Sequence, residues 1–209
     1  MTRAPTSPWF APRPSRVVAH AWRLLLCATL VWLPAQARAD AQAGKLKAQA
    51  CVACHGPMGN STDPQYPVLA GQTARYLSLQ LKDFKDGRRR DPRMSPAAAK
   101  LSNADIKDLA DYFAAQKAVP VASNANDAAV EAGHMKSNSE RCTACHAANF
   151  AGQNETPRIA GQHDQYIVKQ LRDFRSHTRT NDGGNMGSVV RNLTDDDIRN
   201  IASYISTLQ

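Results

Sequence analysis

Two short motifs hold the residues with the most distinctive chemistry in this sequence. Both have the pattern C-x-x-C-H, and they consist of Cys51, Cys54 and His55 and of Cys142, Cys145 and His146. In this pattern the two thiols can bond covalently to the vinyl groups of a haem, while the adjacent imidazole supplies an axial nitrogen to the iron. The short spacing lets all three groups reach one edge and one face of a single macrocycle. The motifs therefore predict two covalently attached haem c groups.

Other kinds of site also contain C-x-x-C, so three alternatives have to be weighed. A thioredoxin-like redox site needs a βαβ setting, and a structural zinc site needs four ligands. Strand-like alternation is absent from the sequence, and neither half offers a second Cys/His pair. Four cysteines in an exported chain would otherwise pair as two disulfides. Because the complete motif recurs inside two matched halves, haem is favoured over all three.

The motifs belong to an internal duplication that predicts two domains. Cys51 and Cys142 are 91 residues apart. Further matches lie 90 to 92 residues apart, among them Ala70–Gln72 with Ala160–Gln162, Gln80–Phe84 with Gln170–Phe174, and Leu101 with Leu193. Two copies are too few for a solenoid, so each must close its own core. A copy of about 80 to 90 residues is marginal for a stable core, and a buried haem would supply the missing apolar surface.

Each copy predicts helices and no strands. One apolar stripe at helical spacing consists of Leu77, Leu81 and Phe84 and is repeated by Ile167, Leu171 and Phe174. A second stripe consists of Ile106, Leu109, Ala110 and Phe113 and is repeated by Ile198, Ile201, Ala202 and Ile205. Ser102 and Thr194 are placed as N-caps, with Asp105 and Asp197 completing capping boxes. We expect an all-α protein of two tandem domains, each wrapped around one haem.

The first 39 residues have the organisation of an export signal. A basic segment precedes an apolar run at 24–33, and Ala37-Arg38-Ala39 gives a small-x-small cleavage pattern. The run has about ten residues, whereas a membrane span needs roughly 20, so a retained anchor is disfavoured, as is lipidation at Cys27. The predicted organisation is a cleaved signal at 1–39, a first haem domain at 40–118, a linker at 119–127 and a second haem domain at 128–209.

The formal net charge of +8 comes largely from this signal. Residues 1–39 contain five arginines and no Asp or Glu, which leaves 21 basic and 18 acidic residues in the rest of the chain. The propionates of two haems would offset that small excess, so nucleic acid is not expected as a partner. We expect the mature protein to be soluble and periplasmic, with association with the membrane surface left open.

Met94 and Met186 are the predicted ligands on the opposite side of each iron. Each lies seven residues before a matched leucine, Leu101 or Leu193, in a loop expected just before the last helix of its copy. The other candidates do not form a matched pair: Met58, His163 and His177 correspond to Asn149, Thr73 and Gly87. Met58 is also only three residues from His55, on the same face of the ring. The duplication therefore predicts His/Met ligation at both irons.

A basic run lies close to the first methionine. It consists of Arg88, Arg89, Arg90 and Arg93, and Asp86 and Asp91 flank it. The run could dock an acidic partner near the first haem, but a solvated loop is favoured because the flanking carboxylates balance part of the charge. The second copy keeps only Arg175 and Arg179.

Taken together, these features resemble the dihaem cytochrome c4 family over residues 40–209. The resemblance is carried by the two C-x-x-C-H motifs, the P-x-x-A-G-Q segments that begin at Pro67 and Pro157, the Q-L-x-D-F helices and the Met94-Ser95-Pro96 loop. It implies two class I cytochrome c folds that face one another, so that electrons pass between the haems. It also implies that the Pro67 and Pro157 carbonyls accept the Nδ1–H of the haem-binding histidines and so fix their orientation. The loop at Met186-Gly187, after Gly183-Gly184, departs from the first and is expected to be looser.

The resemblance also implies a function. It is typical of a periplasmic electron carrier in a respiratory chain, which takes electrons from a quinol-oxidising complex and passes them to a terminal oxidase. Each iron would cycle between ferric and ferrous at high potential, because a thioether opposite histidine raises the potential. No catalysis is expected, since both irons are six-coordinate. The alternatives are an electron-transfer subunit of a larger dehydrogenase complex and, less favoured, a haem enzyme of the peroxidase type.

Overall fold

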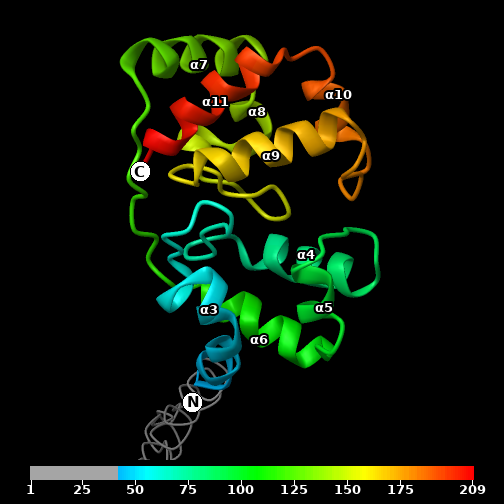
Figure 1. Ribbon diagram of the computed structural model, residues 1–209. Helices are drawn as coiled ribbons and strands as arrows, with labels where there is room; N and C mark the ends of the chain where they lie inside the picture. Colours follow the sequence, from blue (N-terminus) through cyan, green and yellow to red (C-terminus); the bar gives the residue numbers. More distant parts are fainter. Residues whose placement is uncertain (1–41) are drawn as a thin grey trace, which may run out of the picture. The chain divides into compact units, whose positions relative to one another are not determined.

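The computed structural model describes residues 42–209, and the predicted export signal at 1–39 lies outside them. Within the described range the chain is helical, and its β-type pairing is limited to one isolated bridge between Gln153 and Thr156. This confirms the all-α prediction (Figure 1). None of the helices in residues 42–209 has the length and hydropathy needed to cross a membrane.

The two copies have the same order of elements. The first copy begins with a helical stretch at 42–48 and continues with η1 (Gln49–Cys51), α3 (Val52–His55), η2 (Pro57–Gly59), α4 (Ala74–Lys85), α5 (Met94–Ala98) and α6 (Asn103–Ala114). The second copy contains α7 (Asp127–Ser139), α8 (Thr143–His146), η3 (Ala148–Phe150), α9 (Asp164–Arg175), α10 (Asn185–Val190) and α11 (Asp195–Thr207). No helix or strand is present at 117–126, which includes most of the predicted linker. The duplication seen in the sequence is therefore a duplication of structure.

In each copy the first and last helices cross at a glycine. A Cβ atom on Gly133 of α7 would lie 1.9 Å from the carbonyl oxygen of Asn200 in α11, and one on Gly44 would lie 2.5 Å from that of Asp108 in α6. Both distances are too short for any side chain, so only glycine lets the two helices approach this closely. Figure 1 shows α7 and α11 crossing obliquely in the second copy.

The predicted apolar stripes form the cores of the two copies. In the second copy they meet in one cluster that consists of Phe150, Ala160, Ile167, Phe174, Val190, Leu193, Ile198, Ile201, Ala202 and Ile205. The corresponding cluster in the first copy is smaller and consists of Ala48, Leu77, Leu109, Ala110 and Phe113. Phe84 and Ile106 are also buried there but lie outside this cluster. The first copy thus has less continuous apolar contact of its own.

Both predicted capping boxes are present. The Ser102 hydroxyl accepts the backbone N–H of Asp105, and the Asp105 carboxylate accepts the backbone N–H of Ser102 at the start of α6. Thr194 and Asp197 make the same reciprocal bonds at the start of α11. These bonds satisfy amide groups that a helix leaves unpaired at its first turn.

The capping box of α11 should make the free energy of unfolding depend on pH. Hydrogen bonds from the backbone and side chain of Thr194 lower the pKa of Asp197. Because the pKa is lower in the folded state, this carboxylate stabilises the fold above its unfolded pKa of about 4, and the contribution is lost as the pH falls through the folded value. We predict that Asp197→Asn lowers the free energy of unfolding at neutral pH and that the deficit shrinks below about pH 4.

Denaturant titrations of the haem-loaded protein at several pH values measure this effect. Asp196→Asn is the matched control, because Asp196 lies in the same turn but outside the capping box, with its side chain 82% exposed. A deficit for Asp197→Asn that stays constant down to pH 2 would contradict the prediction.

Candidate functional site

Each C-x-x-C-H motif is held on a one-turn helix that buries the histidine and leaves the second cysteine accessible. In the first copy His55, at the end of α3, is 4% exposed, Cys51 is half-buried and Cys54 is exposed. His146, at the end of α8, is 7% exposed, with Cys142 half-buried and Cys145 exposed. None of these four cysteines is paired with another in a disulfide, so the alternative of two disulfides is not what the described residues show.

The chemistry of the thiols does not favour a zinc or dithiol redox site. Burial raises the pKa of Cys142 to about 11, and burial likewise raises the pKa of Cys51. Neither thiol therefore has the lowered pKa that is typical of the reactive cysteine in a dithiol redox site. Residues 42–209 also contain no group of three or more His, Cys, Asp or Glu side chains placed to hold a metal ion.

The two imidazoles are oriented by the same kind of contact. The Nδ1 atom of His55 lies 2.9 Å from the carbonyl oxygen of Pro67, and that of His146 lies 3.0 Å from the carbonyl oxygen of Pro157. A carbonyl can only accept, so each Nδ1 carries the proton and each Nε2 keeps its lone pair. Burial lowers the pKa of both histidines, against the opposing effect of the proline carbonyls, so both rings are neutral.

One of these nitrogens is left without any partner. The Nε2 atom of His55 is fully buried and has no hydrogen-bond partner among the described residues. A buried, unsatisfied nitrogen costs about 1 to 3 kcal/mol unless something coordinates it. A neutral imidazole with a free lone pair in an apolar site is the donor that haem iron requires. The residues present therefore fit the predicted haem.

The two predicted methionines lie in matched turns. Met94 is the first residue of α5, Met186 is the second residue of α10, and both are half-buried. The sequence predicted loops here; the structure has short helices, whose single turns are too brief to give a periodic pattern. Asp91 accepts the backbone N–H of Met94 at 3.2 Å, and Asp182 accepts that of Met186.

The comparisons with known proteins identify the family of the chain. A sequence model of the cytochrome c family matches residues 41–117 and again residues 130–209. Cytochrome c4 of Pseudomonas aeruginosa is 43% identical over 194 residues, which cover 88% of this chain and 96% of that protein. The crystal structure of reduced recombinant cytochrome c4 from Pseudomonas stutzeri matches with a TM-score of 0.75 at 38% identity, covering 81% of this chain and 98% of that one.

The chain belongs to the cytochrome c4 family. As a member of this family it is a dihaem c-type cytochrome with two covalently bound haem c groups, and it transfers electrons rather than catalysing a reaction. A further relative is the thiosulfate dehydrogenase electron acceptor of Stutzerimonas stutzeri. It is 35% identical over 173 residues, which cover 77% of this chain and 80% of that protein.

Two buried arginines add a feature of this protein that was not predicted from the sequence. Arg89 donates to Gln80 in its own half and to Tyr166 and Gln170 in the other. Arg179 donates in the same way to Gln170 in its own half and to Tyr76 and Gln80 in the other. Each guanidinium also lies over a phenylalanine ring, Phe84 at 4.6 Å or Phe174 at 4.4 Å. All of these partners recur at an offset of 90 residues, which is the pattern that could have revealed them.

This placement corrects the interpretation of the arginine run for one residue. Arg89 is buried and is neither a solvated loop residue nor part of an exposed docking surface. Arg88 remains at the surface, where it pairs with Asp83 and Asp86. Neither Arg89 nor Arg179 forms an ion pair with a carboxylate in residues 42–209, although buried charges usually need one.

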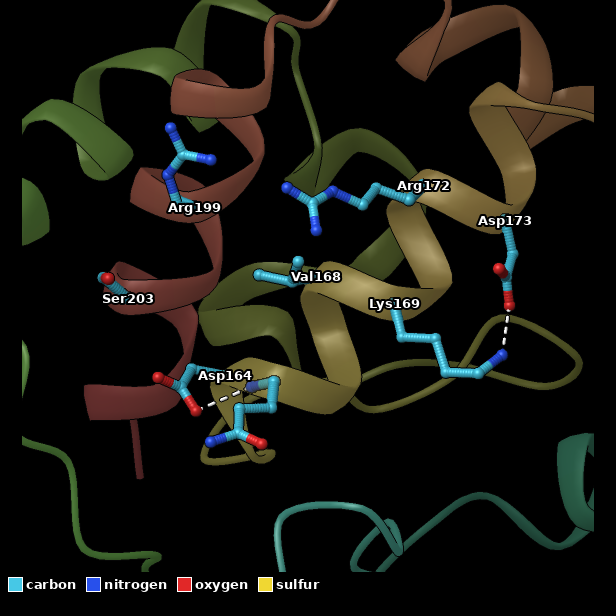
Figure 2. A pocket seen from close by; sticks show the side chains of 8 residues that line it. Asp164, Val168, Lys169, Arg172, Asp173, Arg199 and Ser203 are labelled. Carbon is cyan, nitrogen blue, oxygen red and sulfur yellow. Dashed lines mark hydrogen bonds and ion pairs between the residues drawn. The ribbon is translucent and has the colours of Figure 1, made fainter.

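A groove in the second copy lies outside this site. It has a volume of about 550 Å³ and lies between α9 and α11 (Figure 2). Most of its charged side chains form ion pairs, Lys169 with Asp173 at 2.5 Å, Arg172 with Asp195 at 2.9 Å, and Arg199 with Asp196, whereas Asp164 accepts the backbone N–H of Gln165. The groove is therefore a surface depression between two helices, and most of its charges are satisfied within the protein.

Asp182 should control how firmly Met186, the predicted ligand of the second haem, is held in place. Its carboxylate bonds the backbone N–H groups of Met186 and Gly184, so Asp182→Ala removes two hydrogen bonds that are worth about 1 kcal/mol each. We predict that the equilibrium between bound and released methionine shifts towards release by roughly tenfold or more. The red charge-transfer band of methionine-ligated ferric haem, followed during warming, measures this. Asp182→Asn keeps an acceptor oxygen and should behave nearly as the parent; equal loss in both variants would contradict the prediction.

Proposed function

We propose that this cytochrome is exported, loses residues 1–39 by cleavage after Ala39, and works in the periplasm as a high-potential electron carrier. Its mature part would consist of two cytochrome domains, at 40–118 and 128–209, joined by the linker at 119–127. The observation that carries the proposal is the buried Nε2 of His55, which has no hydrogen-bond partner among the described residues. The Nδ1 contact with Pro67 that orients this ring recurs between His146 and Pro157.

In this proposal each residue of the site has a defined task. The thiols at Cys51, Cys54, Cys142 and Cys145 attach the haems, and the irons are ligated by His55 with Met94 and by His146 with Met186. Each bound haem supplies one-electron chemistry between ferric and ferrous iron. The proline carbonyls hold the imidazoles in one orientation and raise their basicity. The methionine thioethers raise the potential, and the buried arginines balance the propionates.

The proposed partners are a quinol-oxidising complex as donor and a terminal oxidase as acceptor. Two high-potential centres in one chain fit a position between these complexes in a respiratory chain. To test this, the oxidised mature protein is mixed with quinol and membranes that contain a quinol:cytochrome c oxidoreductase, and then with membranes that contain an oxidase. Fast reduction in the first mixture and reoxidation in the second support the proposal; no exchange with either would refute it.

A second candidate function is that of electron-transfer subunit or acceptor for a dehydrogenase. It is favoured by the likeness to the thiosulfate dehydrogenase electron acceptor. Co-purification separates the two candidates. A dehydrogenase subunit should co-purify with its partner at a fixed stoichiometry and be reduced by that enzyme's substrate. A free carrier should purify alone and be reduced by the quinol system.

A further inference from the structure

In each half of the cytochrome, one buried glutamine side chain forms hydrogen bonds with the backbone of the other half. The side-chain amide of Gln162 accepts the backbone N–H of Val68 at 2.9 Å and donates to the carbonyl of Val68 at 3.0 Å. Gln72 makes the same pair of bonds to Arg158, accepting at 2.7 Å and donating at 2.8 Å. Gln162 is 6% exposed and Gln72 is 7% exposed. Each glutamine therefore satisfies both backbone groups of one residue in the opposite half.

The residues bound by the glutamines directly follow the prolines that orient the two histidines. Val68 directly follows Pro67, so the N–H of Val68 and the carbonyl of Pro67 belong to the same peptide group. That carbonyl accepts Nδ1–H of His55 at 2.9 Å. In the other half, Arg158 follows Pro157, whose carbonyl accepts Nδ1–H of His146 at 3.0 Å. A continuous chain of two hydrogen bonds through one peptide group thus joins each histidine to a glutamine of the other half.

Hydrogen bonds in such a chain polarise one another, and more strongly where water is excluded. When Gln162 accepts the N–H of Val68, the carbonyl oxygen of Pro67 becomes more negative and a better acceptor for His55. A better acceptor at Nδ1–H makes the imidazole more basic towards iron. A more basic ligand favours the ferric state, so the glutamine lowers the potential of the haem it acts on.

We propose that the two glutamines are reciprocal positioning residues, Gln162 tuning the first haem and Gln72 tuning the second. This inference rests on the proposed ligation at His55 and His146. Its distinctive consequence is a crossed effect, because a substitution in one half should change the haem of the other half more than its own. A residue with a merely structural role in the interface would not discriminate between the haems in this way.

The test is a redox titration of Gln162→Met and Gln72→Met in the holoprotein, with each haem followed by its own NMR methyl resonances. Methionine has a similar length but offers no amide to the peptide group. We expect Gln162→Met to raise the potential of the first haem and Gln72→Met that of the second. In ¹⁵N-histidine spectra of the reduced protein, the Nδ1–H resonance of the affected histidine should shift with it, while that of the other histidine stays in place.

Two further variants show whether a shift in potential comes from the glutamine itself or from weaker packing between the two halves. Gln162→Glu retains an oxygen that can accept the N–H of Val68, so the potential of the first haem should return towards or below the parent value. His163→Phe removes a neighbouring buried bond between the halves, from Nε2 to the Ser61 carbonyl at 2.9 Å, without touching a proline peptide. It should produce no crossed shift.

The outcomes separate this inference from the proposed function. Equal shifts at both haems, or a shift only in the mutated half, would overturn the reciprocal role of the glutamines. If the parent protein itself lacks two histidine–methionine haems, the proposed ligation fails instead. Shifts in His163→Phe that match those of Gln162→Met would show a general effect of the interface and would also overturn the inference.

Discussion

With Met94 and Met186 as the proposed ligands, Met94→His should lower the reduction potential of the first haem, and Met186→His that of the second, by on the order of 0.1 V or more each. The reason is that a thioether stabilises ferrous iron better than an imidazole does, and axial ligands are the strongest control on haem potential. Both methionines lie in the first turn of a short helix, and an aspartate accepts the backbone N–H of each. A histidine at either position should therefore occupy the same place as the methionine that it replaces. Spectroelectrochemical titration of each variant measures the two steps separately.

Met58→His is the matched control for this experiment. Met58 is also close to a C-x-x-C-H motif, but its side chain is 55% exposed and it lies in the turn directly after His55. Its replacement should leave both redox steps in place. If Met58→His moves a potential as far as Met94→His does, or if either helix variant moves neither step, the assigned ligands are wrong.

Removing the attachment cysteines should unfold the first half far more than the second. The double variant Cys51→Ala/Cys54→Ala leaves the first half without covalent haem, and its largest apolar cluster has only five residues, two of them alanines. A domain of this size has a free energy of unfolding of about 5 kcal/mol. The apolar contacts that are lost with the haem contribute more than this. The buried Phe84 and Ile106, which lie outside that cluster, would then have less to pack against.

The matched variant is Cys142→Ala/Cys145→Ala in the second half. There ten buried residues form one continuous cluster, so more helix should remain. Far-ultraviolet circular dichroism and limited proteolysis, with haem content determined for each variant, measure the difference. Equal loss of helix and equal protease sensitivity in the two double variants would contradict the prediction.

The fold could be predicted from the sequence mainly because it is duplicated. A stripe such as Leu77, Leu81 and Phe84 is weak on its own, but its repetition 90 residues later identifies a helix that both copies must bury. The capping boxes at Ser102 and Thr194 are local in sequence and were therefore predictable as well. The short helices at Met94 and Met186 were not, because one turn shows no periodicity.

The contacts between the halves could not be derived from local pattern. Arg89 lies in a run of arginines flanked by carboxylates, which is typical of a solvated loop, and only the tertiary arrangement buries it. Gln72 and Gln162 stand in recurring segments but have no property in the sequence that assigns them a partner. Their partners lie 86 and 94 residues away and are backbone groups, which carry no sequence signature.

A redox titration of the mature, secreted protein, followed by its visible spectrum, tests the central claim most directly. Two histidine–methionine haems predict two one-electron steps at positive potential, low-spin spectra in both oxidation states with the methionine charge-transfer band, and no binding of carbon monoxide to the reduced protein. A strongly negative potential, or a reduced haem that binds carbon monoxide readily, would contradict the account, because at least one iron would then lack a firmly held methionine.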